Sequence, residues 1–216
     1  APFPDTDKAQ WPLEVTFDGG ARTLGGDQKV AGAGATLWRH RGYGGLPDLV
    51  ASCVIAIPGC DNAQLAEATG CRAGLGLLTL EDPSYRAARI AGDNLAVIRY
   101  GRGTGRFRNL RLCAQMDLGL APLTSKGWQL HWVAIRRRLN KAADRLATLG
   151  VFWAARLRAI GDTNTRTWVV KHTDHTHVIP LHFPSGNWAS LDPDEVRDVA
   201  DDLEAMAARH RRESRN

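Results

Sequence analysis

The sequence predicts an α/β fold, in which helices flank a mixed sheet and a smaller segment follows at the C-terminal end. Two observations support this class. Three stretches with the residue alternation of strands follow one another near the N-terminus, and helical and strand patterns then alternate up to residue 150. The expected order is three strands, a helix, a strand, two helices, a strand and a helix, so the sheet has five strands.

The first three strands occupy the N-terminal third of the chain. Residues 1–10 are polar and contain proline, and we expect a flexible lead-in there. From Trp11, apolar residues at Leu13, Val15 and Phe17 alternate with polar ones, which predicts a strand that ends at Asp18 before two glycines. Residues 31–40 and 50–57 are the next two strand candidates, and short glycine-bearing links favour an antiparallel meander.

The period then changes to that of a helix. Over residues 62–80, apolar and small residues recur at helical spacing, and Asp61 or Asn62 can cap the start. Small residues on one flank allow this helix to lie close to the sheet, and Glu67 is at the edge of that flank.

The next elements alternate in type. Residues 87–92 form a short apolar strand that ends at Asp93, and a helix follows over residues 94–100. A basic, glycine-rich loop at 101–108 leads to a helix at 109–120, a strand at 128–135 and a helix at 140–149, with Asn140 as its expected N-cap.

The pattern differs after Gly150, so we divide the chain into a lead-in (1–10), a main domain (11–150) and an extension (151–216). In the extension we expect a short helix at 151–160, a hairpin at 167–183 and a helix at 191–212. This ββα-like pattern does not indicate a role.

Composition excludes several classes of protein. No apolar run is long enough to span a bilayer, and the start lacks the apolar core of a signal peptide, so we expect an intracellular protein of the nucleus or cytoplasm. The four cysteines form no CxxC pair, which favours reduced thiols, although a bridge between Cys53 and Cys60 stays open. Residues 1–150 carry 19 Lys and Arg against 13 Asp and Glu, whereas residues 151–216 carry 9 against 10. A basic surface of this kind suits a polyanionic partner, or it is a basic surface without a function.

Four acidic residues carry the functional prediction: Asp18, Glu67, Asp93 and Asp144. Each lies where a strand ends or where a helix faces a sheet, so folding would bring them together. Clustered carboxylates repel one another, and divalent cations relieve that repulsion. Two cations about 4 Å apart are a common device for hydrolysing phosphodiesters. The pattern predicts a metal-dependent nuclease, although each acid taken alone fits a turn, a solvated helix face or a helix N-terminus.

Residues 11–150 resemble a type 1 ribonuclease H domain, of the kind found in retroelement reverse transcriptases and plant-type ribonuclease H-like proteins. The segments FDGGAR, AGAGATLW, AEATGCRAGL, GDNLAVI and LHWVAIRRRLNKAADRLA match its motifs in order, and successive acids are 49, 26 and 51 positions apart. The resemblance implies a mixed five-stranded sheet in which three antiparallel strands precede two parallel ones.

The resemblance also implies an activity. The enzyme would cleave the RNA strand of RNA–DNA hybrids with two Mg²⁺ ions (Mn²⁺ can substitute), leaving 5′-phosphate and 3′-hydroxyl ends. Asp18 would bridge both ions, Glu67 and Asp93 would complete one site, and Asp144 would help to hold the other. The residues implied in contacting the hybrid are Gly19, Gly20, Asn62, Gln64, Arg106 and Arg137. Other domains of a reverse transcriptase polyprotein would be further partners.

Two departures from the family pattern leave alternatives open. The loop before the last helix contains Arg136, Arg137 and Arg138 where many members have a histidine that assists turnover. Ala63 and Gln64 replace the usual asparagines before Glu67. A nucleic-acid-binding or scaffold module with weak or no cleavage is therefore the alternative, and a related polynucleotidyl transferase is a third reading that fits the motifs less well.

Overall fold

The computed structural model describes residues 11–25, 28–40, 47–60, 62–82, 84–171 and 177–178. The strands are β1 (Leu13–Thr23), β2 (Lys29–Arg39), β3 (Asp48–Ile57), β4 (Ala87–Gly92), β5 (Gln129–Ala134), β6 (Arg166–Lys171) and β7 (His177–Val178). The helices are α1 (Ala63–Leu78), α2 (Leu95–Gly101), α3 (Leu110–Ser125) and α4 (Lys141–Ala159), with a one-turn 3₁₀ helix at Arg137–Leu139. Three predicted features lie outside the described residues: the lead-in at residues 1–10, the turn of the hairpin at 167–183 and the helix at 191–212.

The sheet confirms the predicted mixed architecture and is larger than predicted. Its strand order is β5-β4-β1-β2-β3-β6-β7. Strands β1, β2 and β3 form the expected antiparallel meander, and β4 and β5 run parallel to β1. The prediction of five strands was too low, because β6 pairs antiparallel with the outer edge of β3 and β7 pairs with β6. Unpaired backbone groups on an edge strand favour such an addition.

Helix α4 continues across Gly150, where we placed the end of the main domain. It has no break there, and the short helix expected at 151–160 is its last half. The expected helix end came from a change in composition, but Leu146, Leu149, Trp153 and Leu157 keep one apolar side against the sheet. The division into three segments stays a prediction, although neither α4 nor the sheet is interrupted at residue 150.

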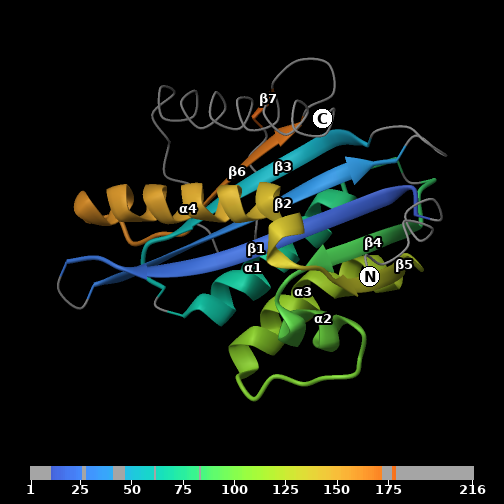
Figure 1. Ribbon diagram of the computed structural model, residues 1–216, viewed down its shortest axis with the longest axis horizontal. Helices are drawn as coiled ribbons and strands as arrows, with labels where there is room; N and C mark the ends of the chain where they lie inside the picture. The colour runs from blue at the N-terminus through green and yellow to red at the C-terminus, as the bar shows by residue number, and fades with distance from the viewer. Residues whose placement is uncertain are drawn as a thin grey trace.

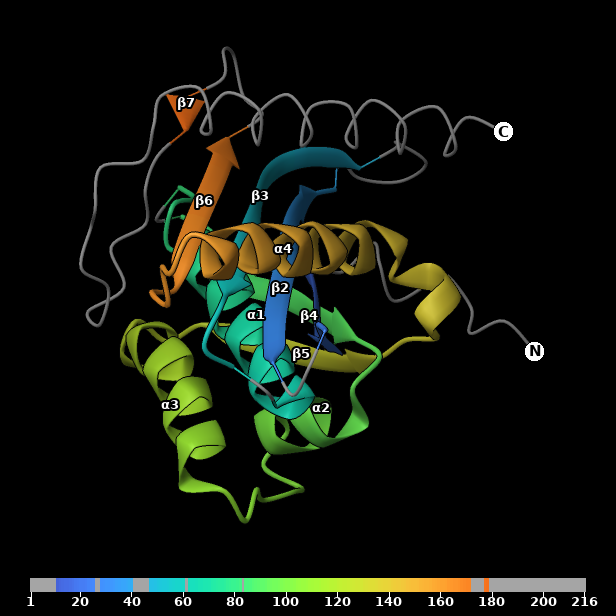
Figure 2. The ribbon, with the colours of Figure 1, turned by 90° about the vertical axis from the view of Figure 1, so that its left-hand side faces the viewer.

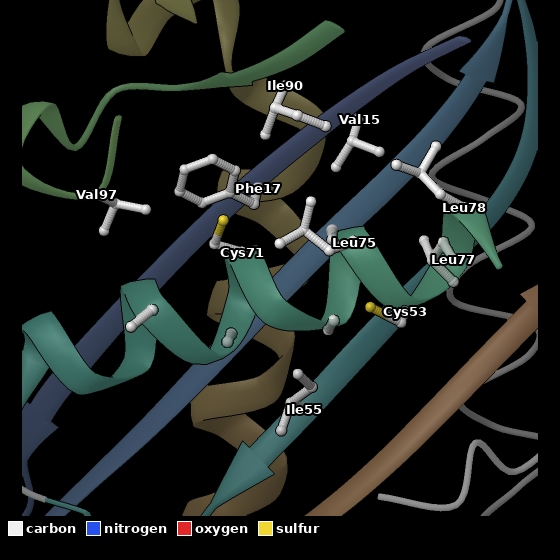
Figure 3. Packing of buried hydrophobic residues seen from close by; sticks show 14 of the residues in the cluster. Val15, Phe17, Cys53, Ile55, Cys71, Leu75, Leu77, Leu78, Ile90 and Val97 are labelled. Atoms are coloured by element: carbon white, nitrogen blue, oxygen red, sulfur yellow. The ribbon is translucent and has the colours of Figure 1, made fainter. Parts of the chain in front are cut away.

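Helices cover both faces of the sheet, and two apolar cores result (Figures 1 and 2). Helix α1 packs on β1 and β2 from one side and contacts α3, whereas α4 crosses β1, β2 and β3 on the other side. In Figure 3, Cys71, Leu75 and Leu78 of α1 lie against Val15 and Phe17 of β1. Alternation along β1 explains the division, because Leu13, Val15 and Phe17 enter the α1 core while the residues between them face the α4 side.

Two further findings bear on the composition. Cys53, Cys60, Cys71 and Cys113 are all free thiols, and the first three are buried. Within the described part of the chain, no helix is long and apolar enough to cross a membrane.

Candidate metal centre

Asp18 and Asp93 lie next to each other because their strands are parallel neighbours. In the register of β1 and β4, Thr16 pairs with Ala91. Asp18 and Asp93 each follow two residues later, so the two acids lie side by side on neighbouring strands. The predicted strand end at Asp18 was wrong, because β1 continues to Thr23, whereas Asp93 directly follows the end of β4. Asp18 is buried and Asp93 is half-buried.

Glu67 reaches these two residues because α1 lies unusually close to β1. A Cβ atom added to Gly19 would overlap the backbone of Ala66 and Glu67, and one added to Gly70 would overlap the carbonyl of Asp18. Any side chain at either glycine would push the helix away from the strand. This close packing explains why residue 19 is a glycine. Its contact with RNA stays a prediction.

Asp144 reaches the same place from the opposite face of the sheet. It lies in the first turn of α4, and α4 approaches β2 closely because Gly32 and Gly34 have no side chains there. Gly34 is paired with Asp18 across the two strands. The Asp144 side chain is consequently close enough to Asp18 to hydrogen-bond with it and to raise its pKa.

Burial and mutual repulsion determine the charge state of the cluster. Burial, and then the Asp93 carboxylate, raise the pKa of Asp18 from 3.8 to about 7, although the Gly19 N–H donates a 2.9 Å hydrogen bond to its Oδ1. Burial, and then Asp18 and Asp93, raise the pKa of Glu67 from 4.5 to about 8. Burial and the neighbouring carboxylates therefore outweigh the positive charge of Arg137, which interacts with Asp18 and Asp93.

Two asparagines orient the acids, and neither of these roles was predicted from the sequence. Asn94 caps α2 by accepting hydrogen bonds from Ala96 and Val97, and its side chain also hydrogen-bonds to Glu67. Asn140 was expected to cap α4, but its side chain makes no such bond. Its Nδ2 instead donates to the Phe17 carbonyl at 2.8 Å and to Asp93 Oδ1 at 3.2 Å. Asparagine at a helix start is read as a cap by default, so only the fold reveals this contact.

Arg137 contacts the fourth acid. Its Nη2 lies 2.8 Å from Asp144 Oδ1, and it belongs to the one-turn helix that precedes Asn140. The Asp144 carboxylate raises the pKa of Arg137 further above its usual value.

Three of the acids fit a divalent metal ion. One oxygen from each of Asp18, Glu67 and Asp93 can lie within 4.8 Å of the others. Glu67 Oε2 is buried and has no hydrogen-bond partner among the described residues. Carboxylate oxygens are the ligands that Mg²⁺ and Mn²⁺ prefer. A cation bound here would relieve the repulsion between the carboxylates and give Glu67 Oε2 a partner.

The other predicted contact residues lie around this cluster or beyond it. Asn62 caps α1 by accepting from the N–H groups of Gln64 and Leu65, and Gln64 is exposed in the first turn. A Cβ on Gly20 would meet nothing within 4 Å. Arg106 is exposed in the loop between α2 and α3. These residues are thus accessible, and their contact with a substrate stays a prediction.

The loop that contains Arg106 is held by aromatic packing. Phe107 stacks on Tyr100 with ring centroids 4.9 Å apart. The ring is partly buried and packs against the α1 core, so Phe107 helps to hold the loop within the fold.

Comparison with solved structures identifies the architecture. The chain is similar to the N-terminal ribonuclease H domain of a Mycobacterium tuberculosis protein, solved as a fusion with maltose-binding protein (TM-score 0.54, 24% identity, 68% of this chain and 99% of that one). It is also similar to ribonuclease H1 from the archaeon Halobacterium salinarum (TM-score 0.53, 23% identity, 65% and 97%). A third similar structure is LC11-RNase H1 in complex with an RNA/DNA hybrid (TM-score 0.52, 20% identity, 66% and 99%).

These likenesses show that the chain has a ribonuclease H-like fold, as the motifs predicted. No protein-family model matches the chain, and no curated protein sequence matches it significantly.

Proposed function

We propose that this protein is a metal-dependent endonuclease that hydrolyses the RNA strand of RNA–DNA hybrids. The observation that carries the proposal is the convergence of four carboxylates, from β1, α1, the end of β4 and α4, beside two interior strands of a ribonuclease H-like sheet. A fold alone does not determine a function, because function depends on the site built on it. Here the site itself has the chemistry of a hard-cation centre.

Each acid has a role that its position supports. Asp18, Glu67 and Asp93 would hold one Mg²⁺ ion, and Asp18 and Asp144 would hold a second one. Bound there, the ions would activate water and neutralise the charge that develops at phosphorus, leaving 5′-phosphate and 3′-hydroxyl ends. Mn²⁺ would substitute, because it prefers the same oxygen ligands.

The surrounding residues keep these acids in place. Asn94 orients Glu67, and Asn140 connects Asp93 to the backbone of β1 through the Phe17 carbonyl. Because both amides also make backbone contacts, they restrict the carboxylate rotamers before any ion arrives, which lowers the cost of ordering the site.

The charge state makes the activity depend on pH. Carboxylates must lose their protons to bind a metal ion. Since the pKa values of Asp18 and Glu67 are raised to about 7 and about 8, metal binding releases protons at neutral pH and strengthens as the pH rises through this range. Activity should therefore increase between about pH 6 and about pH 8.

Substrate binding would use the basic side of the chain. Arg106 and Arg108 are exposed in the loop after α2, and Arg111 is exposed in the first turn of α3. Arginine side chains bind phosphate oxygens without reading sequence. The hybrid is the proposed substrate because the 2′-hydroxyls of its RNA strand distinguish it from DNA.

A cleavage assay tests this proposal. Matched RNA–DNA, RNA–RNA and DNA–DNA duplexes are incubated with Mg²⁺, Mn²⁺ or a chelator, and the products are separated on a gel. The wild type should cut only the RNA of the hybrid and only with a metal ion. Asp93→Asn should still bind the hybrid but leave it intact, whereas Asp82→Asn, an exposed acid in the turn before β4, should cut normally. Cleavage that persists in Asp93→Asn or in chelator would refute the proposal.

One observation favours the alternative of a binding module that does not cut. Arg137 already neutralises Asp144, and a permanently paired Asp144 could not hold a second ion. The same assay separates the two functions, because a binding module would retain the hybrid without products even with Mn²⁺.

A further inference from the structure

Asp144 differs from the other three acids in its partner. Asp18, Glu67 and Asp93 form the group that can share one ion, and Asp144 is not a member of it. The Asp144 carboxylate instead accepts a hydrogen bond from a guanidinium, at 2.8 Å. A cation therefore already lies at one of the two Asp144 oxygens, and its positive charge opposes a second metal ion there.

The exposure of the two partners indicates that this contact can open. The Arg137 side chain is 77% exposed and that of Asp144 is 36% exposed. Ion pairs this accessible to water contribute little, because solvent screens the attraction and two long side chains lose rotamer freedom. The pair can thus form and break readily.

The backbone that carries Arg137 is, in contrast, anchored. Asn140 is buried and bonds to both the Phe17 carbonyl and Asp93, three residues after Arg137. The loop consequently keeps the backbone of Arg137 beside the carboxylate cluster, so a movement away from Asp144 involves only the Arg137 side chain. Arg136 and Arg138 flank it, are also exposed, and make no ion pair among the described residues.

We propose that Arg137 is an internal counter-cation that reserves Asp144, so that a second divalent ion binds there only when Arg137 moves away. This inference rests on the proposed function, because it assumes that the cluster binds metal ions. A phosphate of the substrate is a strong competitor for a guanidinium, which binds such groups with two parallel hydrogen bonds. Substrate would then release Asp144 and strengthen binding of the second ion, and linkage requires the reverse effect as well.

The two ions should differ in how strongly Arg137 affects the affinity of the protein for each. Arg137 contacts Asp144 directly, whereas it acts on Asp18 and Asp93 only through its charge and more weakly. Removing the guanidinium should therefore tighten the weaker ion more than the tighter one. An exposed ion pair of this kind corresponds to an increase in affinity of about two- to fivefold.

Titration calorimetry with Mn²⁺ tests this on the full chain without substrate. The variants are Arg137→Gln, Arg137→Lys, and Arg138→Gln as the matched control in the same loop. We expect Arg137→Gln to tighten the weaker ion about two- to fivefold and to change the affinity for the tighter ion by a smaller factor. Arg137→Lys retains the charge and should stay near the wild type, and Arg138→Gln should change neither ion.

A second titration, with a non-cleavable hybrid that has 2′-deoxy residues at the cleavage positions, tests the coupling. The hybrid should tighten the weaker ion in the wild type and do so much less in Arg137→Gln. Three results would each overturn the proposal. The wild type and Arg137→Gln could bind the weaker ion with equal affinity, Arg137→Gln and Arg138→Gln could shift that affinity equally, or Arg137→Gln could bind no second ion.

The outcomes also distinguish this inference from the proposed function. Normal hybrid cleavage together with unchanged ion binding in Arg137→Gln would refute the counter-cation and leave the nuclease intact. A wild type that binds no ion and cuts no hybrid would refute both.

Discussion

Replacing Asp18 by asparagine should abolish hybrid cleavage and, without divalent ions, make the folded protein more stable at pH 8. The pKa of this carboxyl group is raised by burial and by Asp93, from 3.8 to about 7. Such a group takes up a proton on folding, so its contribution destabilises the folded state as the pH rises from about 4 to about 7. Asparagine has nearly the same shape and no charge, and its Oδ1 can still accept the hydrogen bond from the Gly19 N–H.

The size of the gain follows from the shift in pKa. One pKa unit corresponds to about 1.4 kcal/mol, so a shift of roughly three units sets an upper bound of about 4 kcal/mol. Part of the shift is shared with Asp93 and Asp144, and these groups can relax or take up protons themselves. We therefore expect Asp18→Asn to raise the free energy of unfolding by about 1–3 kcal/mol at pH 8 and by less than about 1 kcal/mol at pH 4.

Urea unfolding followed by tryptophan fluorescence, with chelator present, measures this difference at both pH values. Asp82→Asn is the matched control, because Asp82 is exposed and should give no gain at pH 8. Adding Mg²⁺ should stabilise the wild type at pH 8 and have a much smaller effect on Asp18→Asn. An Asp18→Asn protein that is less stable than the wild type at pH 8, or that gains equally at both pH values, would refute the electrostatic argument.

Three other predictions test how the site is built. Gly19→Ala should lower the free energy of unfolding by about 2 kcal/mol or more, because its Cβ would overlap the α1 backbone, whereas Gly20→Ala should change it by less than about 1 kcal/mol; equal effects in urea unfolding would contradict the packing argument. Asn140→Ala should lower the free energy of unfolding by about 1–3 kcal/mol and weaken Mg²⁺ binding about tenfold or more. Calorimetry that finds unchanged Mg²⁺ affinity would show that Asp93 does not need the contact with Asn140. Arg106→Gln should weaken hybrid binding and reduce the slope of log affinity against log salt by about 1; an unchanged slope in a binding titration would place Arg106 away from the phosphates.

Local sequence patterns were sufficient to predict most strands and helices, because alternation and helical spacing depend on residues close together in the sequence. Alternation along residues 13–17 predicts β1, and helical spacing with Asn62 as cap predicts α1; both are confirmed, although β1 continues to Thr23. The end of α4 was wrong by ten residues, since packing against β3 and β6 outweighs the change in composition after Gly150. Pairing of β6 with β3 was also missed, because strand pairing over a long separation leaves no local pattern.

The sequence by itself determined most of the elements, their order, and which four acids to consider, because helix period, strand alternation and motif order are properties of neighbouring residues. Only the tertiary structure decided that Asn140 binds Asp93 instead of capping α4, that Gly19 and Gly70 set the distance between α1 and β1, and that Arg137 pairs with Asp144. The physical reason is that these contacts depend on how closely a helix approaches a strand. A few ångströms of backbone separation determine them, and that separation is fixed by packing on both faces of the sheet.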